Sequence, residues 1–211
     1  MMIIKKPLQY ATVIDRQGDC GVFDTMDDAI RLACVAAEEY SNLDTNKRND
    51  ITNAAISTLN NHLEELSTMF CKEIGQDSYD EILHDNIAAL NNYKNYSILS
   101  TNNKLNAYND SCLVSGIIIE SSNSLETIIQ NSILTLKSGN AIVFSSNKNM
   151  KNVFSYAIKL INNAIEAIGG PKNLVVTVKE PSNESTNILI ENEKVTLISA
   201  INSCNEEKVA L

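Results

Sequence analysis

Short apolar runs alternate with amphipathic helical patterns over residues 112–201. The run Cys112–Ile119 is almost continuously apolar, which is typical of a strand buried on both faces. Ala141–Phe144 and Leu174–Val178 repeat this pattern, and Val195–Ile201 is a candidate fourth strand. Strands joined by crossover helices pair in parallel. The sequence therefore predicts an α/β fold with a parallel sheet and flanking helices.

The two helices between these strands carry start and stop signals. Ser124 is a candidate N-cap for the first, and Gly139 is its expected C-terminal stop. The second covers Val153–Ile168 and ends at Gly169-Gly170-Pro171, where a left-handed cap precedes a helix breaker. The apolar inner face of the first helix consists of Ile128, Ile129, Ile133 and Leu136.

Residues 1–95 are predicted to be a helical region that packs on the sheet. Thr25 and Asp28 form a capping pair ahead of one helix, and a longer helix is expected from about Thr45 to Ile74. A third helical piece ends near Asn91. Residues 96–110 are polar and loosely alternating, which favours a β-hairpin, and residues 111–211 then form the sheet region. The positions expected on one face of the long helix are Ile56, Leu59, Leu63, Leu66 and Phe70, and those of the third piece are Ile82, Ile87 and Leu90.

Charge and hydropathy exclude two classes of partner. The 211 residues include 17 basic and 26 acidic side chains, a formal charge of −9. Without a basic run, the chain is unsuited to nucleic acid and to anionic membrane surfaces. The longest strongly apolar stretch, Gly116–Ile119, is far shorter than the ~20 residues that span a bilayer. We therefore expect neither a nucleic-acid nor a membrane partner.

The five cysteines are odd in number and far apart, and no Cys-x-x-Cys occurs. This favours reduced thiols in a cytoplasmic protein. The only histidines, His62 and His84, are not beside a cysteine, so no metal site is expected. Cys112 and Cys204 are candidate nucleophiles, but Cys112 begins a buried strand, Cys204 lies in a polar tail, and neither has a base nearby in sequence.

Polar residues follow three of the predicted strands: Glu120–Asn123, Ser145–Lys148 and Lys179–Ser182. Ligands of open parallel sheets bind beyond the carboxyl ends of the strands. These three loops are therefore where the sequence predicts a binding site.

Several blocks, in the right order, resemble the coenzyme-A-acylating aldehyde dehydrogenases of ethanolamine and propanediol utilisation. They are Gly21–Ile30, Asn123–Ser132, Ser138–Ser145, Ala157–Ala167, Gly169–Val178 and Glu180–Asn187. The resemblance extends from about Gly21 to Lys194 and covers only the front part of the family's chain. It implies a Rossmann-like cofactor region, preceded by helices and a protruding oligomerisation hairpin. Family members use a nucleophilic cysteine, NAD and coenzyme A to convert an aldehyde to an acyl-coenzyme A.

The resemblance also implies site residues. Asn123 matches an asparagine whose side-chain amide stabilises an oxyanion, although a turn asparagine beside a helix N-cap is the alternative interpretation. Ser121, Ser122, Ser145, Lys148 and Gly170 match the cofactor-binding region. Lys148 follows a strand end, where a cation meets a nucleotide phosphate or ribose, or else is simply solvated.

Three departures from the family pattern change the expected contacts. Glu120 and Ser124 stand where the family has prolines, and Ser145-Ser146-Asn147-Lys148 replaces a Ser-Pro-His-Pro pattern. The segment Ile198–Ser203 lacks the family's glycine, and a Cβ hinders close approach of the backbone to a phosphate.

We therefore expect a truncated aldehyde-dehydrogenase-like protein without the catalytic cysteine domain, inactive alone, in the cytoplasm or a bacterial microcompartment. The expected cofactors are NAD and coenzyme A, and the expected partner is a second copy or a full-length paralogue. The alternatives are a non-catalytic assembly or regulatory subunit, which uses the hairpin and acidic helices to join a full-length dehydrogenase or a microcompartment cargo, and a weak binder of adenine nucleotides or coenzyme A.

Overall fold

The computed structural model describes residues 18–99, 114–119, 124–201 and 208–210. Its strands form a six-stranded sheet with the order β1-β4-β3-β2-β5-β6. The first five strands in this order run parallel, and β6 pairs antiparallel with β5. This confirms the predicted α/β fold with a parallel sheet. The strands are β1 (Val22–Phe23), β2 (Val114–Ile119), β3 (Ala141–Ser145), β4 (Val175–Val178), β5 (Leu197–Ile201) and β6 (Lys208–Ala210).

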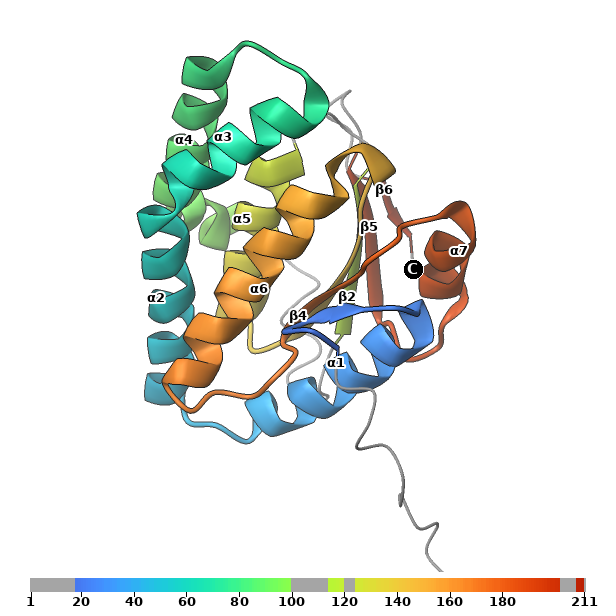
Figure 1. The fold of residues 1–211 in the computed structure, drawn as a ribbon. Coiled ribbons are helices and arrows are strands. Elements are labelled where there is room, and N and C mark those ends of the chain that lie inside the picture. The colour runs from blue at the N-terminus through green and yellow to red at the C-terminus, as the bar shows by residue number, and fades with distance from the viewer. Residues whose placement is uncertain (1–17, 100–113, 120–123, 202–207, 211) are drawn as a thin grey trace, which may run out of the picture.

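Helices cover both faces of the sheet (Figure 1). Helices α1 and α7 pack on one face, α5 and α6 pack on the other, and α2, α3 and α4 form an outer layer against α5 and α6. Their bounds are α1 (Met26–Ser41), α2 (Thr45–Asn61), α3 (Leu63–Ile74), α4 (Tyr79–Leu99), α5 (Ser124–Lys137), α6 (Lys151–Ala167) and α7 (Asn183–Glu191). Within the helical N-terminal region, α1 therefore packs on the sheet itself, as predicted, whereas α2, α3 and α4 pack on the sheet helices α5 and α6.

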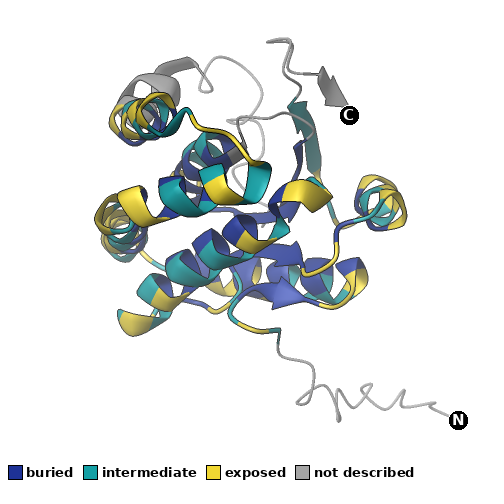
Figure 2. Ribbon diagram, turned by 45° about the horizontal axis from the view of Figure 1, so that its top comes forward, coloured by how far each residue is buried: buried dark blue, intermediate teal, exposed yellow. Residues whose placement is uncertain are grey.

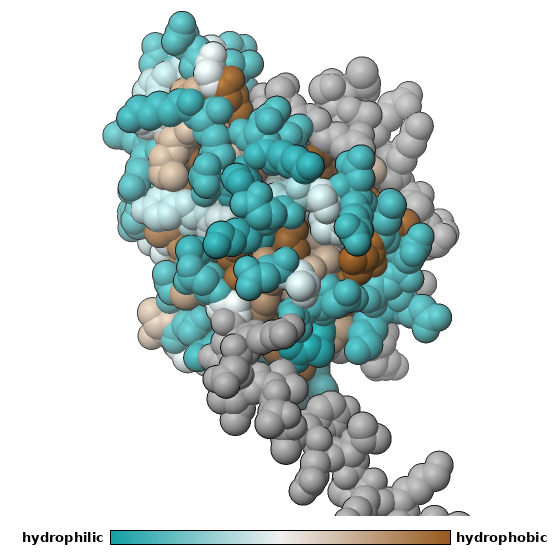
Figure 3. Space-filling view, turned by 45° about the vertical axis from the view of Figure 1, so that its right-hand side comes forward, coloured by the Kyte–Doolittle hydropathy of each residue, from teal (hydrophilic) through white to brown (hydrophobic). Residues whose placement is uncertain are grey.

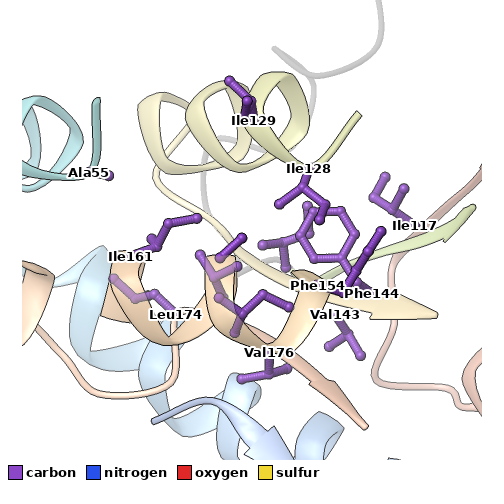
Figure 4. Packing of buried hydrophobic residues seen from close by; sticks show 14 of the residues in the cluster. Ala55, Ile117, Ile128, Ile129, Val143, Phe144, Phe154, Ile161, Leu174 and Val176 are labelled. Atoms are coloured by element: carbon purple, nitrogen blue, oxygen red, sulfur yellow. The ribbon is translucent and has the colours of Figure 1, made fainter. Parts of the chain in front are cut away.

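The centre of the sheet is the core. Every residue of β2, β3 and β4 is buried, which explains why these strands are continuously apolar rather than alternating. Figure 2 shows these strands as buried, with exposed residues along the outer sides of the helices. Phe144 of β3 and Phe154 of α6 meet edge to face, with ring centroids 6.3 Å apart (Figure 4). This geometry suits the aromatic quadrupoles.

The predicted capping signals are confirmed where the structure describes them. The hydroxyl of Thr25 accepts a hydrogen bond from the amide of Asp28 at the start of α1. Gly139 and Gly169 have φ values of 81° and 74°, the left-handed conformation that ends a helix. The amide of Gly170 then donates to the carbonyl of Ile165.

Three predictions were wrong in detail: the single long helix, the end of the third helix near Asn91, and the start of the β-hairpin. The single helix from Thr45 to Ile74 is two helices, because the chain leaves helical geometry at His62 (φ −111°, ψ 12°) without a glycine or proline to signal the break. The β-hairpin predicted from residue 96 is wrong over residues 96–99, where α4 continues to Leu99. This segment also lacks a helix-breaking residue. Residues 100–110 of the hairpin lie outside the described residues.

The sequence analysis missed β1, β6 and α7. Strand β1 has only two residues, too few to show a pattern. Helix α7 is short and polar, but Ser182 and Ser185 form a reciprocal capping box at its start, and Leu189 anchors it in the core. Within the expected apolar faces, Ile56 is only half-buried and Ile87 is exposed.

Candidate functional site

The strand order reverses at β2. The chain proceeds from β2 to β3 to β4 on one side and then returns to place β5 on the other side of β2. Such a switch point opens a crevice at the carboxyl ends of the strands. The loops after β2 and β5, residues 120–123 and 202–207, lie outside the described residues. The candidate site residues Ser121, Ser122 and Asn123 therefore have no described position.

Ser145 is the last residue of β3 and lies at the carboxyl edge, as predicted. Its side chain is buried, and its hydroxyl lies 2.7 Å from that of Thr186 in α7. The next residue, Ser146, is also buried, and its hydroxyl lacks a hydrogen-bond partner among the described residues. A buried hydroxyl without a partner costs about 1–3 kcal/mol of stability, and Ser132 of α5 is a second such hydroxyl among the described residues.

Lys148 lies at the same edge. It begins a short 3₁₀ helix, Lys148–Met150, between β3 and α6, and its side chain is exposed. Its charge acts on Glu180, which follows β4. The structure therefore places Ser145 and Lys148 at the carboxyl end of β3, beside Glu180 at the end of the neighbouring β4.

Gly170 lies at the opposite edge, beyond the C-terminus of α6. A Cβ on Gly170 would come within 2.5 Å of the Ile165 side chain and 3.0 Å of the Ile165 carbonyl oxygen. Glycine is needed there because the chain turns closely against α6 and α2. The structure does not bring Gly170 together with Ser145 and Lys148.

A cleft of ≈ 760 Å³ lies at the carboxyl edge, beside β1 and β4. This volume is within the range of small-molecule sites. Three segments line most of this cleft: the turn from β1 into α1, the first turns of α6, and the residues after β4. Its lining includes Asp24, Thr25, Asp28, Lys151, Asn152, Ser155, Lys159, Lys179 and Glu180.

Ion pairs order the walls of this cleft. The Lys151 ammonium donates to both carboxylate oxygens of Glu180 at 2.7 Å, and Arg31 donates to Asp28 at 2.9 Å. Lys159 pairs with Asp19. The hydrogen bond from Lys151 holds the pKa of Glu180 below its usual value, and the charges of Lys179 and Lys148 act in the same direction. Glu180 is therefore ionised at neutral pH.

The N-terminus of α6 is already occupied by a carboxylate of the protein. Glu73 of α3 accepts hydrogen bonds from the amides of Asn152 and Val153, at 2.9 and 2.8 Å. These amides would otherwise be a natural anion site. The sequence did not signal this contact, because Glu73 and Asn152 are 79 residues apart.

Glu126 is a second carboxylate that the sequence analysis missed, in the first turn of α5. Burial raises its pKa, and the nearby charge of Asp85 raises it further, while a hydrogen bond from Gln130 at 2.8 Å opposes both effects. Asp85 of α4 and Glu126 of α5 both line a small pocket between these helices.

The described part of the chain contains three cysteines. Its cysteines, Cys20, Cys34 and Cys71, are free and half-buried, and burial raises the pKa of Cys34. Cys112 and Cys204 lie outside that part. Within it, no group of three or more histidine, cysteine or carboxylate side chains is placed to hold a metal ion.

The surface is mainly polar on the face seen in Figure 3, where apolar groups occur in small separate patches among the described residues. None of the described helices combines the length and the apolar character that crossing a bilayer requires.

Comparisons with known proteins identify the relatives of this fold. The model of the aldehyde dehydrogenase family matches residues 11–206. A coenzyme-A-propanoylating propanal dehydrogenase of Citrobacter freundii is 31% identical over 186 residues, which cover 85% of this chain and 40% of the relative. The chain therefore spans well under half the length of this relative.

Solved structures of similar fold come from the same family of enzymes. The propionaldehyde dehydrogenase of Rhodopseudomonas palustris, with bound propionyl-CoA, superposes with a TM-score of 0.73 at 30% identity, over 87% of this chain and 42% of that one. An engineered glycolyl-CoA reductase with bound NADP+ gives a TM-score of 0.70 at 29% identity, over 87% and 43% of the two chains. The parallel sheet, the matched residues and these superpositions together confirm the resemblance, and the chain belongs to the aldehyde dehydrogenase family, with coenzyme-A-acylating propanal and acetaldehyde dehydrogenases among its relatives.

Proposed function

We propose that this chain is the nucleotide-binding front part of a coenzyme-A-acylating aldehyde dehydrogenase, inactive alone and dependent on a catalytic cysteine supplied elsewhere. The observation that carries the proposal is the parallel sheet with a switch point between β2 and β5, beside which β3 ends in the buried Ser145 and Ser146. The relatives with bound propionyl-CoA and NADP+ support it.

The residues at this edge fit an adenine nucleotide. Ser146 contributes a buried hydroxyl without a described partner, and the cleft beside β4 offers lysine donors and carboxylate acceptors. In the family reaction, NAD accepts the hydride and coenzyme A takes the acyl group. This chain would bind and orient the nucleotides through Ser145, Lys148 and the loop of Ser121 and Ser122, and Asn123 would donate its amide to the developing oxyanion.

An assay of the purified chain tests this proposal. With acetaldehyde, coenzyme A and NAD, the chain alone should give no increase in NADH absorbance, while NAD or coenzyme A should raise its melting temperature. Steady NADH production would contradict the dependence on an external cysteine. The absence of any thermal shift with either nucleotide would contradict nucleotide binding.

A non-catalytic assembly subunit is the second candidate, and the exposure of β5 favours it. All five residues of β5 are only half-buried, in contrast to β2, β3 and β4, and Ile190 of the adjacent α7 is 48% exposed. A partly uncovered sheet with nearby apolar groups suits association with a full-length dehydrogenase or with a second copy.

Co-purification with a full-length acylating dehydrogenase from the same organism tests this candidate. Ile190→Asp should abolish the association. Ile87→Asp is the matched control, because Ile87 is also exposed but lies on α4, which packs on the other side of the sheet. Equal binding by wild type and both variants, or no binding by the wild type, would rule out an interface at α7 and β5. We also propose that either form works in the cytoplasm or in a bacterial microcompartment, and the names of the ethanolamine- and propanediol-utilisation relatives support this.

A further inference from the structure

The chain enters β1 through a tight turn. The amide of Asp19 donates to the carbonyl of Val22 at 2.9 Å, and the amide of Val22 donates back to the carbonyl of Asp19 at 3.1 Å. The two residues between them, Cys20 and Gly21, have φ values of 49° and 93°. Positive φ at both central positions is typical of a type I′ turn, which joins two antiparallel strands. The chain that precedes Asp19 is therefore directed back along β1.

Strand β1 lies at the edge of the sheet, so only one of its sides is paired with another strand of the described sheet. On that side, the carbonyl of Gly21 accepts from the amide of Thr177 at 2.9 Å, and the carbonyl of Phe23 accepts from the amide of Lys179 at 2.7 Å. The backbone groups of successive strand residues point to opposite sides. Those of Val22 and of the following residue, Asp24, therefore point away from β4.

The backbone of Asp24 is open on this free side. Neither its amide nor its carbonyl has a hydrogen-bond partner among the residues that the structure describes. In an antiparallel ladder, hydrogen-bonded pairs alternate with pairs that are not hydrogen-bonded. Counted from the bonded pair Asp19 and Val22, the next bonded pair is Gln17 and Asp24. The register of the turn therefore assigns the open groups of Asp24 to Gln17.

The intervening pair, Gly18 and Phe23, agrees with this register. A Cβ on Gly18 would come within 2.6 Å of the Phe23 ring and of the Val22 carbonyl oxygen. The backbone at Gly18 thus lies directly against β1, and only glycine allows this close approach. Gly18, Asp19 and Asp24 all line the cleft of ≈ 760 Å³. A strand that continues from Gly18 would therefore run along this cleft.

Charge favours the same placement. Residues 1–17 contain three basic side chains and one acidic side chain, in a chain whose formal charge is −9. At the start of α1, the carboxylates of Asp24 and Asp27 are exposed. In the register set by the turn, Arg16 lies opposite Thr25, so its guanidinium is within reach of both carboxylates.

We propose that residues 14–17 form an antiparallel strand on the free side of β1, and that Arg16 pairs with the carboxylates of Asp24 and Asp27. The backbone groups of Gln17 then exchange hydrogen bonds with those of Asp24. The segment before Gly18 thereby becomes the wall of the cleft on its β1 side. This inference does not rest on the proposed nucleotide-binding function.

Hydrogen exchange at the Asp24 amide, measured by NMR on the isotopically labelled full chain, tests this strand. Asp24 is exposed, so its amide exchanges rapidly unless Gln17 accepts its hydrogen bond. We expect exchange to be at least about 10-fold slower in the wild type than in a variant that lacks residues 1–17. The amide of Thr177, which donates to Gly21, should stay protected in both proteins and shows that the sheet is intact.

Point variants locate the contact without shortening the chain. Gln17→Pro removes the amide that donates to the Asp24 carbonyl, so the Asp24 amide should lose its protection. Gln9→Pro is the matched control, because Gln9 precedes the proposed strand, and it should exchange like the wild type. Arg16→Gln should speed exchange at Asp24 by up to about 5-fold, as loss of an exposed ion pair predicts. Lys6→Gln should leave the rate unchanged.

Each outcome supports or overturns a stated part of the inference. Rapid exchange of the Asp24 amide in the wild type would overturn the strand. Protection that survives removal of residues 1–17, or that survives Gln17→Pro, would overturn the assignment of Gln17 as the partner. An Arg16→Gln variant that exchanges like the wild type would overturn the ion pairs. Because no nucleotide is added, none of these results depends on the function proposed above.

Discussion

The two edges of the sheet are built differently. At the amino edge, side chains form hydrogen bonds to backbone carbonyls of other helices. Tyr40 of α1 donates to the Leu136 carbonyl at the end of α5, and Lys47 of α2 donates to the Ile168 carbonyl after α6. At the carboxyl edge, Ser146 retains a buried hydroxyl without a described partner, and charged side chains line a cleft. The amino edge is thus closed by long-range hydrogen bonds to backbone carbonyls, whereas the carboxyl edge carries paired charged side chains around a cleft.

The largest expected effect is the loss of the Asn162 amide at the amino edge. Its nitrogen donates to the carbonyls of Val175 at 2.6 Å and Cys20 at 3.1 Å, and so ties α6 to β4 and to the residue before β1. Asn162→Ala leaves these carbonyls unpaired and should lower the free energy of unfolding by about 3 kcal/mol. Urea denaturation measures this value.

The neighbouring Asn163 provides the control for Asn162. Asn163 is exposed, and its side chain accepts a weak thiol hydrogen bond from Cys20 at 3.2 Å, so Asn163→Ala should change stability by less than about 0.5 kcal/mol. Similar losses in the two variants would show that the amino edge does not depend on Asn162.

The next effect concerns Tyr40, which is fully buried. Tyr40→Phe removes its hydrogen bond to the Leu136 carbonyl, 2.9 Å long, and should cost about 1.5 kcal/mol in unfolding free energy. Thermal unfolding measures this cost. An unchanged melting temperature would mean that the hydrogen bond from Tyr40 does not stabilise the amino edge.

Glu73 gives a smaller effect at the carboxyl edge. Glu73→Gln keeps one of the two acceptors for the α6 amides but removes the other acceptor and the charge that favours the helix N-terminus, so the expected loss is about 1 kcal/mol. The loss should shrink at high salt, since salt screens charge at a helix end. Denaturation at low and at high salt checks this, and a salt-independent loss would contradict the electrostatic explanation.

Glu126 gives the smallest effect, and its sign depends on pH. Because burial and Asp85 raise its pKa in the folded protein, the folded state binds the proton more tightly than the unfolded state. Stability is therefore retained below the unfolded pKa and is lost as pH rises through the folded pKa. Glu126→Gln should melt at a higher temperature than wild type at pH 7, and the difference should vanish below about pH 4.

Glu39→Gln is the control for Glu126, since Glu39 is exposed on α1. Its melting temperature should follow that of the wild type across the same pH range. A Glu126→Gln variant that is less stable than wild type at pH 7 would contradict the assigned direction of the shift.

Local signals predicted much of the fold. Features that depend on a few consecutive residues were predicted from the sequence. They are the buried strands β2, β3 and β4, the Thr25 cap, and the glycines that end helices at Gly139 and Gly169. The break at His62 was not, because a helical apolar pattern continues on both sides of it. Helix α4 likewise extends to Leu99 because nothing in its sequence stops it.

The candidate site was predicted less completely, because its contacts join distant parts of the chain. Ser145 and Lys148 follow a predicted strand, so the sequence placed them at the carboxyl edge. The pairing of Lys151 with Glu180, 29 residues away, requires the order of β3 and β4 in space. Gly170 was assigned from family resemblance, and only the path of α6 shows that it lies at the other edge.

Amide chemical-shift mapping with coenzyme A, on isotopically labelled full chain, tests the contrast between the two edges most directly. The account predicts shifts for the amides of Ser146, Lys148, Lys151 and Glu180, and none for Gly139, Gly169 and Gly170. Shifts confined to those three glycines, or an unchanged spectrum at saturating coenzyme A, would contradict the claim that the carboxyl edge is the nucleotide site.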